Sequence, residues 1–221
     1  MLQRVIEALR EAGAETVLVS CSHRDVARHA EELGAHVVAP ADGPSGSVLS
    51  ALRVTSRPLV VTTADHAFLR SEWVTGLVGG CADKADFALL FAKRAKVEAR
   101  IPGRKRTYFR FSDGKWAGCN LFYLRTPEAR AAIELWQSAE RNRKKPWKLV
   151  ARLGLRNLFD YLSLRLTAAE AVSRLGRRIG IAAAVVSAPD GMAAFDVDSP
   201  DDLDTMHALL DNPVGQPLLA T

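Results

Sequence analysis

The chain has 221 residues, of which 48% are hydrophobic and 25% charged, and its formal net charge is +5. This composition suits one soluble domain, and no apolar run approaches the ~20 residues of a membrane-spanning helix. The first residues carry both charge signs at helical spacing, which is not the pattern of a secretory signal. Cys21, Cys81 and Cys119 form no CxxC pair, so we expect reduced thiols in a cytoplasmic protein and no zinc site.

Short apolar segments alternate between helix and strand periodicity over the first ninety residues. Strands that alternate with helices indicate a parallel sheet covered by helices on both faces. In chain order, the predicted elements are a helix at 2–9, strand 16–21, helix 24–33, strand 36–39, a loop at 43–47 with a helix through 52, strand 59–63 and a helix at 71–78 capped by Ser71.

The pattern changes after residue 86, where an Asp-Gly pair at 113–114 predicts a hairpin turn between two strands. We expect one domain over 1–210, with a basic helical insertion at 141–178 and a tail at 211–221. The predicted elements are strands at 86–93, 107–111 and 115–124, a helix at 126–142, two or three short helices within 147–178, strand 181–187, and a strand end, cap and final helix within 195–210.

The excess positive charge is concentrated in the insertion. Seven basic residues and no acid fall between Arg141 and Arg156. Such a segment suits phosphates, nucleic acid or anionic lipid, or it forms a solvated helix face. RNA binding requires aromatic side chains on which bases stack, whereas Trp147 among lysines suits a membrane surface. We therefore expect peripheral contact with an anionic membrane and no nucleic acid, and we leave the oligomeric state open.

The strand at 59–63 leads to Asp65 and His66. Ligands of open parallel sheets bind at the carboxyl ends of the strands, so Asp65 falls where a ligand would lie. It either binds Mg²⁺, which prefers few carboxylates plus waters and phosphates, or caps the next turn. His66 could contact a phosphate, act as a base or bind metal, but a positioning or structural role is favoured.

A second acidic motif, "FDVDSPDDL", precedes the final helix. Residues two apart on a strand share a face, so Asp196 and Asp198 could share a metal site, although Asp198 could instead cap the helix with Ser199. Pro200 and the acids that follow it are typical of a helix start.

Two further segments could contact a ligand. The stretch Gly43, Pro44, Ser45, Gly46 and Ser47 offers backbone N–H groups to an anion or a base edge. Asn120 lies on an apolar strand and needs a partner, for which a ligand hydroxyl is one candidate. Nearby basic residues could hold a phosphorylated substrate or remain solvated: Arg100, Arg104, Lys105, Arg106 and Arg110.

Taken in order, "GPSGSVLSAL", "LVVTTADHAFL", "GCNLF" and "FDVDSPDDL" resemble the motifs of the MobA-like nucleotidyltransferases over residues 1–210. The resemblance implies a Rossmann-like three-layer α/β/α fold with a mostly parallel sheet. It also implies Mg²⁺-dependent transfer of a nucleoside monophosphate from an NTP to a phosphorylated small molecule or lipid headgroup, with release of pyrophosphate. An acceptor phosphate would attack the α-phosphorus, so the protein would supply positioning and charge neutralisation.

The resemblance also assigns roles to individual residues. Asp65 matches the Mg²⁺-binding aspartate and, with Asp196, forms the expected catalytic pair, while Asp198 is the third expected metal ligand. Residues 43–47 match the loop that contacts the nucleotide base. Gly118 and Asn120 match acceptor-side positions of the family. From the residues themselves, His66, Arg104, Tyr108 and Arg110 are also expected to bind the acceptor.

One departure from the family concerns the N-terminus. The family begins with a strand and a glycine-rich loop, "LAAG-x-G-x-R", that cradles the triphosphate, whereas Met1–Arg4 resembles the segment just after it. We expect a truncated start, which upstream DNA without such an in-frame segment would contradict. The alternative is a nucleotide- or phosphate-binding relative without catalysis. The missing strand would lie mid-sheet, where a partner chain, the 213–221 tail or a rearranged sheet would have to replace it.

Overall fold

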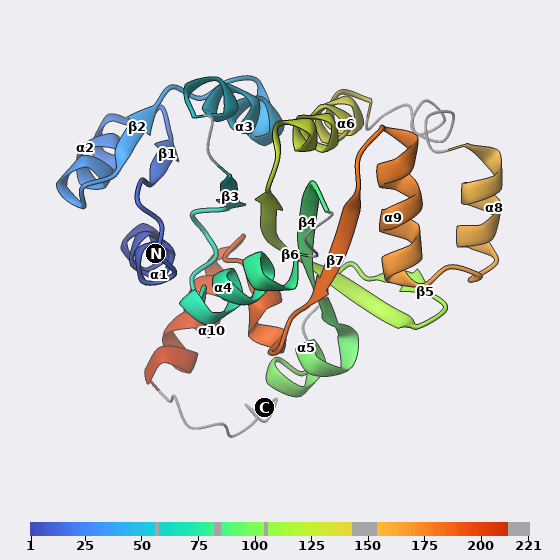
Figure 1. Ribbon diagram of the computed structural model, residues 1–221. Helices are drawn as coiled ribbons and strands as arrows, with labels where there is room; N and C mark the ends of the chain where they lie inside the picture. Colours follow the sequence, from blue (N-terminus) through green and yellow to red (C-terminus); the bar gives the residue numbers. More distant parts are fainter. Residues whose placement is uncertain (56–57, 82–84, 104–105, 143–153, 212–221) are drawn as a thin grey trace.

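The protein is described by a computed structural model that covers residues 1–55, 58–81, 85–103, 106–142 and 154–211 (Figure 1). Its main sheet has the order β3-β6-β4-β7, with β5 beside β6, and β1 and β2 form a separate parallel pair. Strands β3, β4 and β7 run in one direction, and β6 lies antiparallel between β3 and β4. The strands are β1 (Leu18–Ser20), β2 (His36–Val38), β3 (Leu59–Thr62), β4 (Phe87–Lys93), β5 (Phe109–Phe111), β6 (Gly114–Leu124) and β7 (Ala183–Ser187).

Helices cover both faces of the main sheet, because alternate residues of each strand point to opposite faces. Ala88 and Leu90 of β4 join a core with α4 and η2, whereas Phe87 joins a second core with α3 and α6. This arrangement confirms the predicted three-layer α/β/α fold. The helices are α1 (Leu2–Glu11), α2 (Arg24–Glu32), α3 (Gly43–Val54), α4 (Ser71–Gly80), α5 (Arg94–Arg100), η1 (Pro127–Ala129), α6 (Arg130–Arg141), α8 (Leu155–Leu162), α9 (Ala168–Arg178), η2 (Gly191–Ala194) and α10 (Pro200–Asp211).

The sheet is divided between β1 and β3, since no described strand pairs with both of them. This division lies mid-sheet, where the family resemblance expects a further strand. Helix α1 connects the two parts: its Arg4 donates from Nε to the carbonyl oxygen of Ala67, 3.1 Å away, just beyond β3. Val5 of α1 packs in the core of the main sheet, and Ile6 packs in the core of the β1–β2 pair.

Three local predictions were wrong. Residues 43–47 form the first turn of α3 rather than a loop, because Pro44 is compatible with a first helical turn and Ser47 donates to the carbonyl oxygen of Gly43. Residues 195–198 form no strand, since the chain there runs from η2 straight into α10. Ser71 is not a cap: Arg70 holds that position, without a side-chain bond. Residues 143–153 of the basic insertion and 212–221 of the tail lie outside the described part.

The second acidic motif directly follows η2, and η2 packs closely against α5. A Cβ atom on Gly191 would lie 2.1 Å from the carbonyl oxygen of Lys96 and 2.5 Å from Cα of Val97. Both neighbours are backbone atoms, which cannot give way as the end of a side chain can. Only glycine therefore fits at this contact.

Gly191→Ala should consequently lower the free energy of unfolding by about 3 kcal/mol, because either the backbone or the packing must shift. Gly79 in α4 is the matched control, since a Cβ there meets nothing within 4 Å. Gly79→Ala should leave stability unchanged or raise it by up to about 1 kcal/mol. Urea denaturation of both variants measures the difference, and equal midpoints would show that the η2–α5 contact is adaptable.

Candidate active site

The carboxylates of Asp65 and Asp196, distant in sequence, come together beyond the end of β3. The backbone carbonyl of Asp65 accepts a hydrogen bond from the N–H of Val197, 3.1 Å away, which ties the segment after η2 to the segment after β3. Asp196 precedes Val197 and is only 4% exposed. Burial is the main cause that raises the pKa of Asp196, and the negative charge of Asp65 raises it further, as expected for neighbouring carboxylates.

Asp196 is held by two donors from other segments. Its Oδ2 accepts from the guanidinium of Arg106 at 3.1 Å and from the Nδ2 amide of Asn120 at 2.9 Å. Burial is the largest influence on the carboxyl and raises its pKa, while the charge and hydrogen bond of Arg106 act in the opposite direction. The same guanidinium donates to the carbonyl oxygen of Gly118 at 2.9 Å, so Arg106 is fixed between β6 and Asp196.

Asn120 reaches Asp196 because β6 is irregular at this point. The pairing of β6 with β4 changes register between Leu89 and Phe91, and Asn120 has a φ of 46°. A non-glycine residue in this left-handed region costs roughly 1 kcal/mol, which asparagine tolerates better than most residues. The bulge directs the amide of Asn120 out of the regular ladder and toward the acidic pair.

The structure offers a direct test of whether the acidic pair suits a divalent cation. Asp65 Oδ1 is buried, and it has no hydrogen-bond partner among the described residues. A buried carboxylate oxygen without a partner is costly, and a cation would satisfy it. The described residues contain no group of three His, Cys, Asp or Glu side chains placed to hold a metal, so a cation here would need water or substrate phosphates as well. That ligand set is one that Mg²⁺ accepts.

Asp198 does not share this site. It is exposed, because no strand forms at 195–198 to align it with Asp196. Its backbone N–H donates to Oδ2 of Asp202, and the Ser199 hydroxyl donates to the same atom. Of the two roles open to this segment, the structure supports the helix start, since residues 198 and 199 donate to Asp202 in the first turn of α10.

His66, the residue after Asp65, is fully buried, with 0% of its surface exposed. Its Nδ1 lies 3.2 Å from the hydroxyl of Thr62, and its ring stacks on Trp73 at a centroid distance of 6.1 Å. Burial lowers the pKa of His66 to about 4, although the neighbouring Asp65 acts in the opposite direction. A neutral, enclosed imidazole fits the structural role, and contact with an acceptor would require this packing to open.

Stability should therefore depend on pH through His66. The unfolded side chain takes up a proton near its ordinary pKa of 6.5, whereas the folded one does so only at about 4. The native state is favoured above pH 6.5 and loses stability as the pH falls toward 4, by about 2 kcal/mol between pH 7 and 5. Urea denaturation at both values should show this loss in the wild type and little of it in His66→Asn. An equal loss in both would assign it to other groups.

The remaining predicted residues lie apart from the acidic pair or outside the described part. Ser45 is fully buried and donates to Glu140 of α6, and Gly46 lies against the same helix. Gly43 and Pro44 are exposed at the start of α3, and Ser47 Oγ accepts from the N–H of Ala41. Arg104 is not among the described residues.

On the acceptor side, Asn120 contacts Asp196 directly, and Gly118 is linked to it through Arg106. Tyr108 lies beneath the guanidinium of Arg94, 5.6 Å from its ring, and burial raises the pKa of its hydroxyl. Arg110 is exposed on the β5–β6 hairpin. The sequence indicated Arg106 only as one of several nearby basic residues, although it is the one that contacts Asp196. No local signal separates it from its neighbours, because its partner is distant in sequence.

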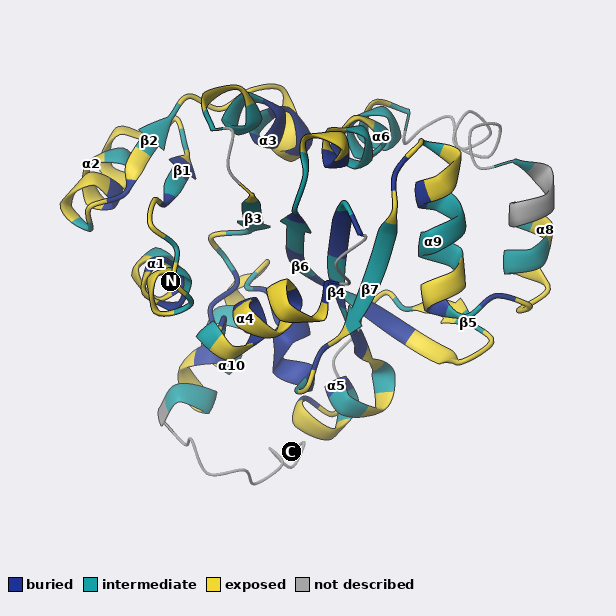
Figure 2. Ribbon diagram, in the orientation of Figure 1, coloured by how far each residue is buried: buried dark blue, intermediate teal, exposed yellow. Residues whose placement is uncertain are grey.

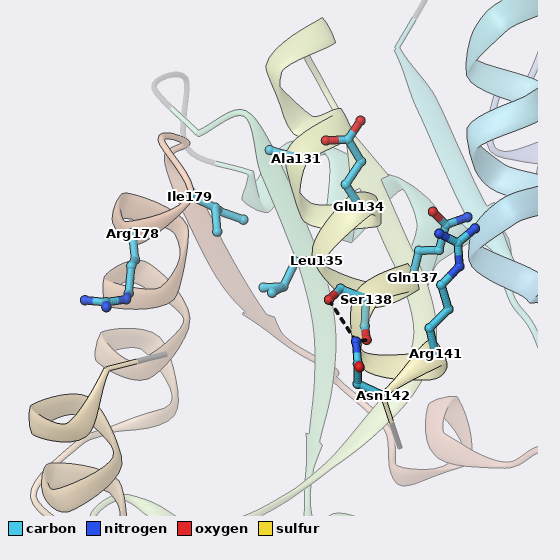
Figure 3. A pocket seen from close by; sticks show the side chains of 9 residues that line it. All are labelled: Ala131, Glu134, Leu135, Gln137, Ser138, Arg141, Asn142, Arg178 and Ile179. Carbon is cyan, nitrogen blue, oxygen red and sulfur yellow. Dashed lines mark hydrogen bonds between the residues drawn. The ribbon is translucent and has the colours of Figure 1, made fainter. Parts of the chain in front are cut away.

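A pocket of about 870 Å³ lies elsewhere, between α6 and α9 (Figure 3). Its lining includes Leu135 and Ser138 from α6, and Ile179 just after α9. None of its lining residues belongs to the acidic pair or its partners. The chain that continues from its rim, 143–153, lies outside the described residues, so we assign no ligand to this pocket.

Fold and site together define an α/β domain with two carboxylates beyond the end of β3, a place where such sheets bind ligands. The family described as the MobA-like NTP transferase domain matches residues 1–158, and the chain belongs to this family. Among curated proteins, none matches the chain by sequence.

Solved structures agree with this fold. A hypothetical transferase from Thermus thermophilus has a TM-score of 0.78 and 29% identity, and the match covers 92% of this chain and 85% of that one. A CMP:2-keto-3-deoxy-manno-octonic acid synthetase in complex with CTP has a TM-score of 0.58 and 15% identity, over 96% and 88% of the two chains. The 2-C-methyl-D-erythritol 4-phosphate cytidylyltransferase of Thermus thermophilus has a TM-score of 0.53 and 16% identity, over 95% and 88%. The last two likenesses concern the fold.

Proposed function

We propose that the protein transfers a nucleoside monophosphate from an NTP to a phosphorylated small molecule and releases pyrophosphate. Membership of the MobA-like NTP transferase family supports this reaction class. The observation that carries the proposal is the buried carboxylate oxygen of Asp65, which has no partner among the described residues and lies beside a second carboxylate. Such an arrangement suits binding of a divalent cation together with phosphates.

Asp65 and Asp196 would hold Mg²⁺ in this reaction. When bound, the ion would neutralise negative charge on the nucleotide phosphates. Asn120 fixes the orientation of the Asp196 carboxylate by its hydrogen bond to Oδ2. Arg106 contributes a permanent positive charge, and its side chain is only 16% exposed, so water screens that charge less than it would at the surface. An acceptor phosphate is already ionised, so it needs no general base, and the enclosed His66 is not required as one.

The choice of nucleotide can be approached through the solved relatives. The synthetase was solved with CTP, and the second relative is named a cytidylyltransferase. CTP is therefore the first nucleotide to test, although nothing in residues 43–47 selects a base.

A thermal-shift screen of the four NTPs, with and without Mg²⁺, tests the proposal first. We expect one NTP to raise the melting temperature, and the increase should be larger with Mg²⁺ because both ligands bind the native state. Pyrophosphate release with that NTP and a panel of phosphorylated sugars and polyols then tests turnover. Nucleotide binding without release, under any acceptor in the panel, would favour a relative that binds nucleotides but does not catalyse.

A further inference from the structure

An apolar strip is exposed on α8 and the turn that follows it. Phe159 is 58% exposed, Leu162 69% and Leu164 41%. Phe159 and Leu162 are three positions apart in α8, so they lie on one face of this helix. Eight large hydrophobic side chains are exposed in the described part of the chain, and three of them fall within these six positions. A concentration of this kind marks an interaction surface.

The opposite face of α8 attaches it to the rest of the molecule. Tyr161 packs edge-on against Phe111 of β5, with ring centroids 5.6 Å apart. Asp160 accepts from the guanidinium of Arg174 on α9 at 2.7 Å. The helix lies at the periphery of the molecule, beside α9 and β5 (Figure 2). The apolar strip is thus presented outward on a helix whose other side is fixed.

Strong positive charge lies close to the apolar strip in the sequence. Residues 141–178 contain eleven lysines and arginines and two acidic residues, so this part of the sequence is more positive than the whole chain. Within the described region, the guanidinium of Arg165 lies over the ring of Phe159, 5.4 Å from its centroid. A second copy of the chain would bring the same charge to the strip and be repelled. The positive charge therefore favours an anionic partner, and the apolar strip favours a partner with apolar groups.

We propose that the apolar strip docks on the surface of an anionic lipid bilayer. Phe159, Leu162 and Leu164 would enter the interface between headgroups and acyl chains, while Arg165 beside Phe159 contacts lipid phosphates. Nucleic acid satisfies the charge, but the aliphatic side chains of Leu162 and Leu164 offer no ring on which bases can stack. Among the described helices none is long and apolar enough to cross a bilayer, so the contact is with the membrane surface.

Sedimentation with vesicles tests this proposal. The full chain should sediment with vesicles that mix phosphatidylglycerol into phosphatidylcholine, and not with phosphatidylcholine alone. Phe159→Ser/Leu162→Ser should weaken binding to the anionic vesicles by roughly tenfold or more, because each side chain gives up its apolar transfer from water. Val54→Ser is the matched control, since Val54 is 68% exposed on α3, outside the strip, and this variant should bind as the wild type does.

A direct reading of insertion completes the test. The wild type has four tryptophans, so the tryptophan fluorescence of Phe159→Trp should be quenched by brominated acyl chains in anionic vesicles more than that of the wild type. Circular dichroism checks that each variant is folded. The proposal would be overturned by equal binding of Phe159→Ser/Leu162→Ser and wild type, by equal binding to neutral vesicles, or by quenching in Phe159→Trp no greater than in the wild type. Tight binding of RNA that survives loss of the strip, with no vesicle binding, would also overturn it in favour of nucleic acid. The proposal is independent of nucleotidyl transfer, so Asp65→Asn should bind vesicles normally.

Discussion

Asp65→Asn should lower the rate of pyrophosphate release on the order of 10²–10³-fold while leaving the protein folded. The substitution keeps the shape of the side chain but removes the negative charge that a divalent cation and its phosphates would need. Folding should not suffer, because Asp65 Oδ1 makes no hydrogen bond to a described residue that the change would break. Removal of the charge also takes away one cause of the raised pKa of Asp196, so stability at neutral pH should stay equal or increase.

The matched control for this prediction is Asp198→Asn. Asp198 is two residues from Asp196 but exposed, and only its backbone N–H forms a described hydrogen bond. Asp198→Asn should retain nearly full activity and the normal increase in melting temperature with Mg²⁺. Asp65→Asn should lose most of that increase as well as its activity. A normal turnover rate in Asp65→Asn would remove this residue from the metal site, and loss of turnover in Asp198→Asn would mean that α10 moves when ligands bind.

Local pattern predicted the position of Asp65 because that position depends on neighbouring residues. The apolar run of β3 forms a strand of the main sheet, and the carboxylate follows at its end. The Asp-Gly pair at 113–114 likewise lies where β5 turns into β6, as a hairpin signal should. Fold class followed from the same alternation of helices and strands. These features need only short-range information.

The sequence could not predict features that depend on distant partners. Local pattern suggested a strand at 195–198, but contacts with α5 and the segment after β3 decide the path of that chain and separate Asp196 from Asp198. The bulge at Asn120 depends on how β6 pairs with β4. Arg106 was one of several basic residues in a row, and only the tertiary fold selects it as the partner of Asp196.

Arg106 should be the most sensitive residue for stability in the site. Arg106→Gln should lower the free energy of unfolding by about 3 kcal/mol, because it removes a guanidinium that pairs with a carboxylate only 4% exposed. The hydrogen bond from Asn120 to Oδ2 would remain. In the double variant Arg106→Gln/Asp196→Asn the buried charge is gone, so the loss should be smaller than the sum of the single losses. Urea denaturation of the wild type, Arg106→Gln, Asp196→Asn and the double variant measures this coupling.

The same variant should change the response to divalent cations. Arg106 already neutralises Asp196 in the wild type, so its removal leaves more charge for a cation to compensate, and Mg²⁺ should stabilise Arg106→Gln more than the wild type. Arg110→Gln serves as the matched control, since Arg110 is an exposed residue of the same basic row and should change neither stability nor the Mg²⁺ response. If Arg106→Gln gains nothing extra from Mg²⁺, the guanidinium and the cation do not share the Asp196 carboxylate, and Arg106 is a structural partner alone.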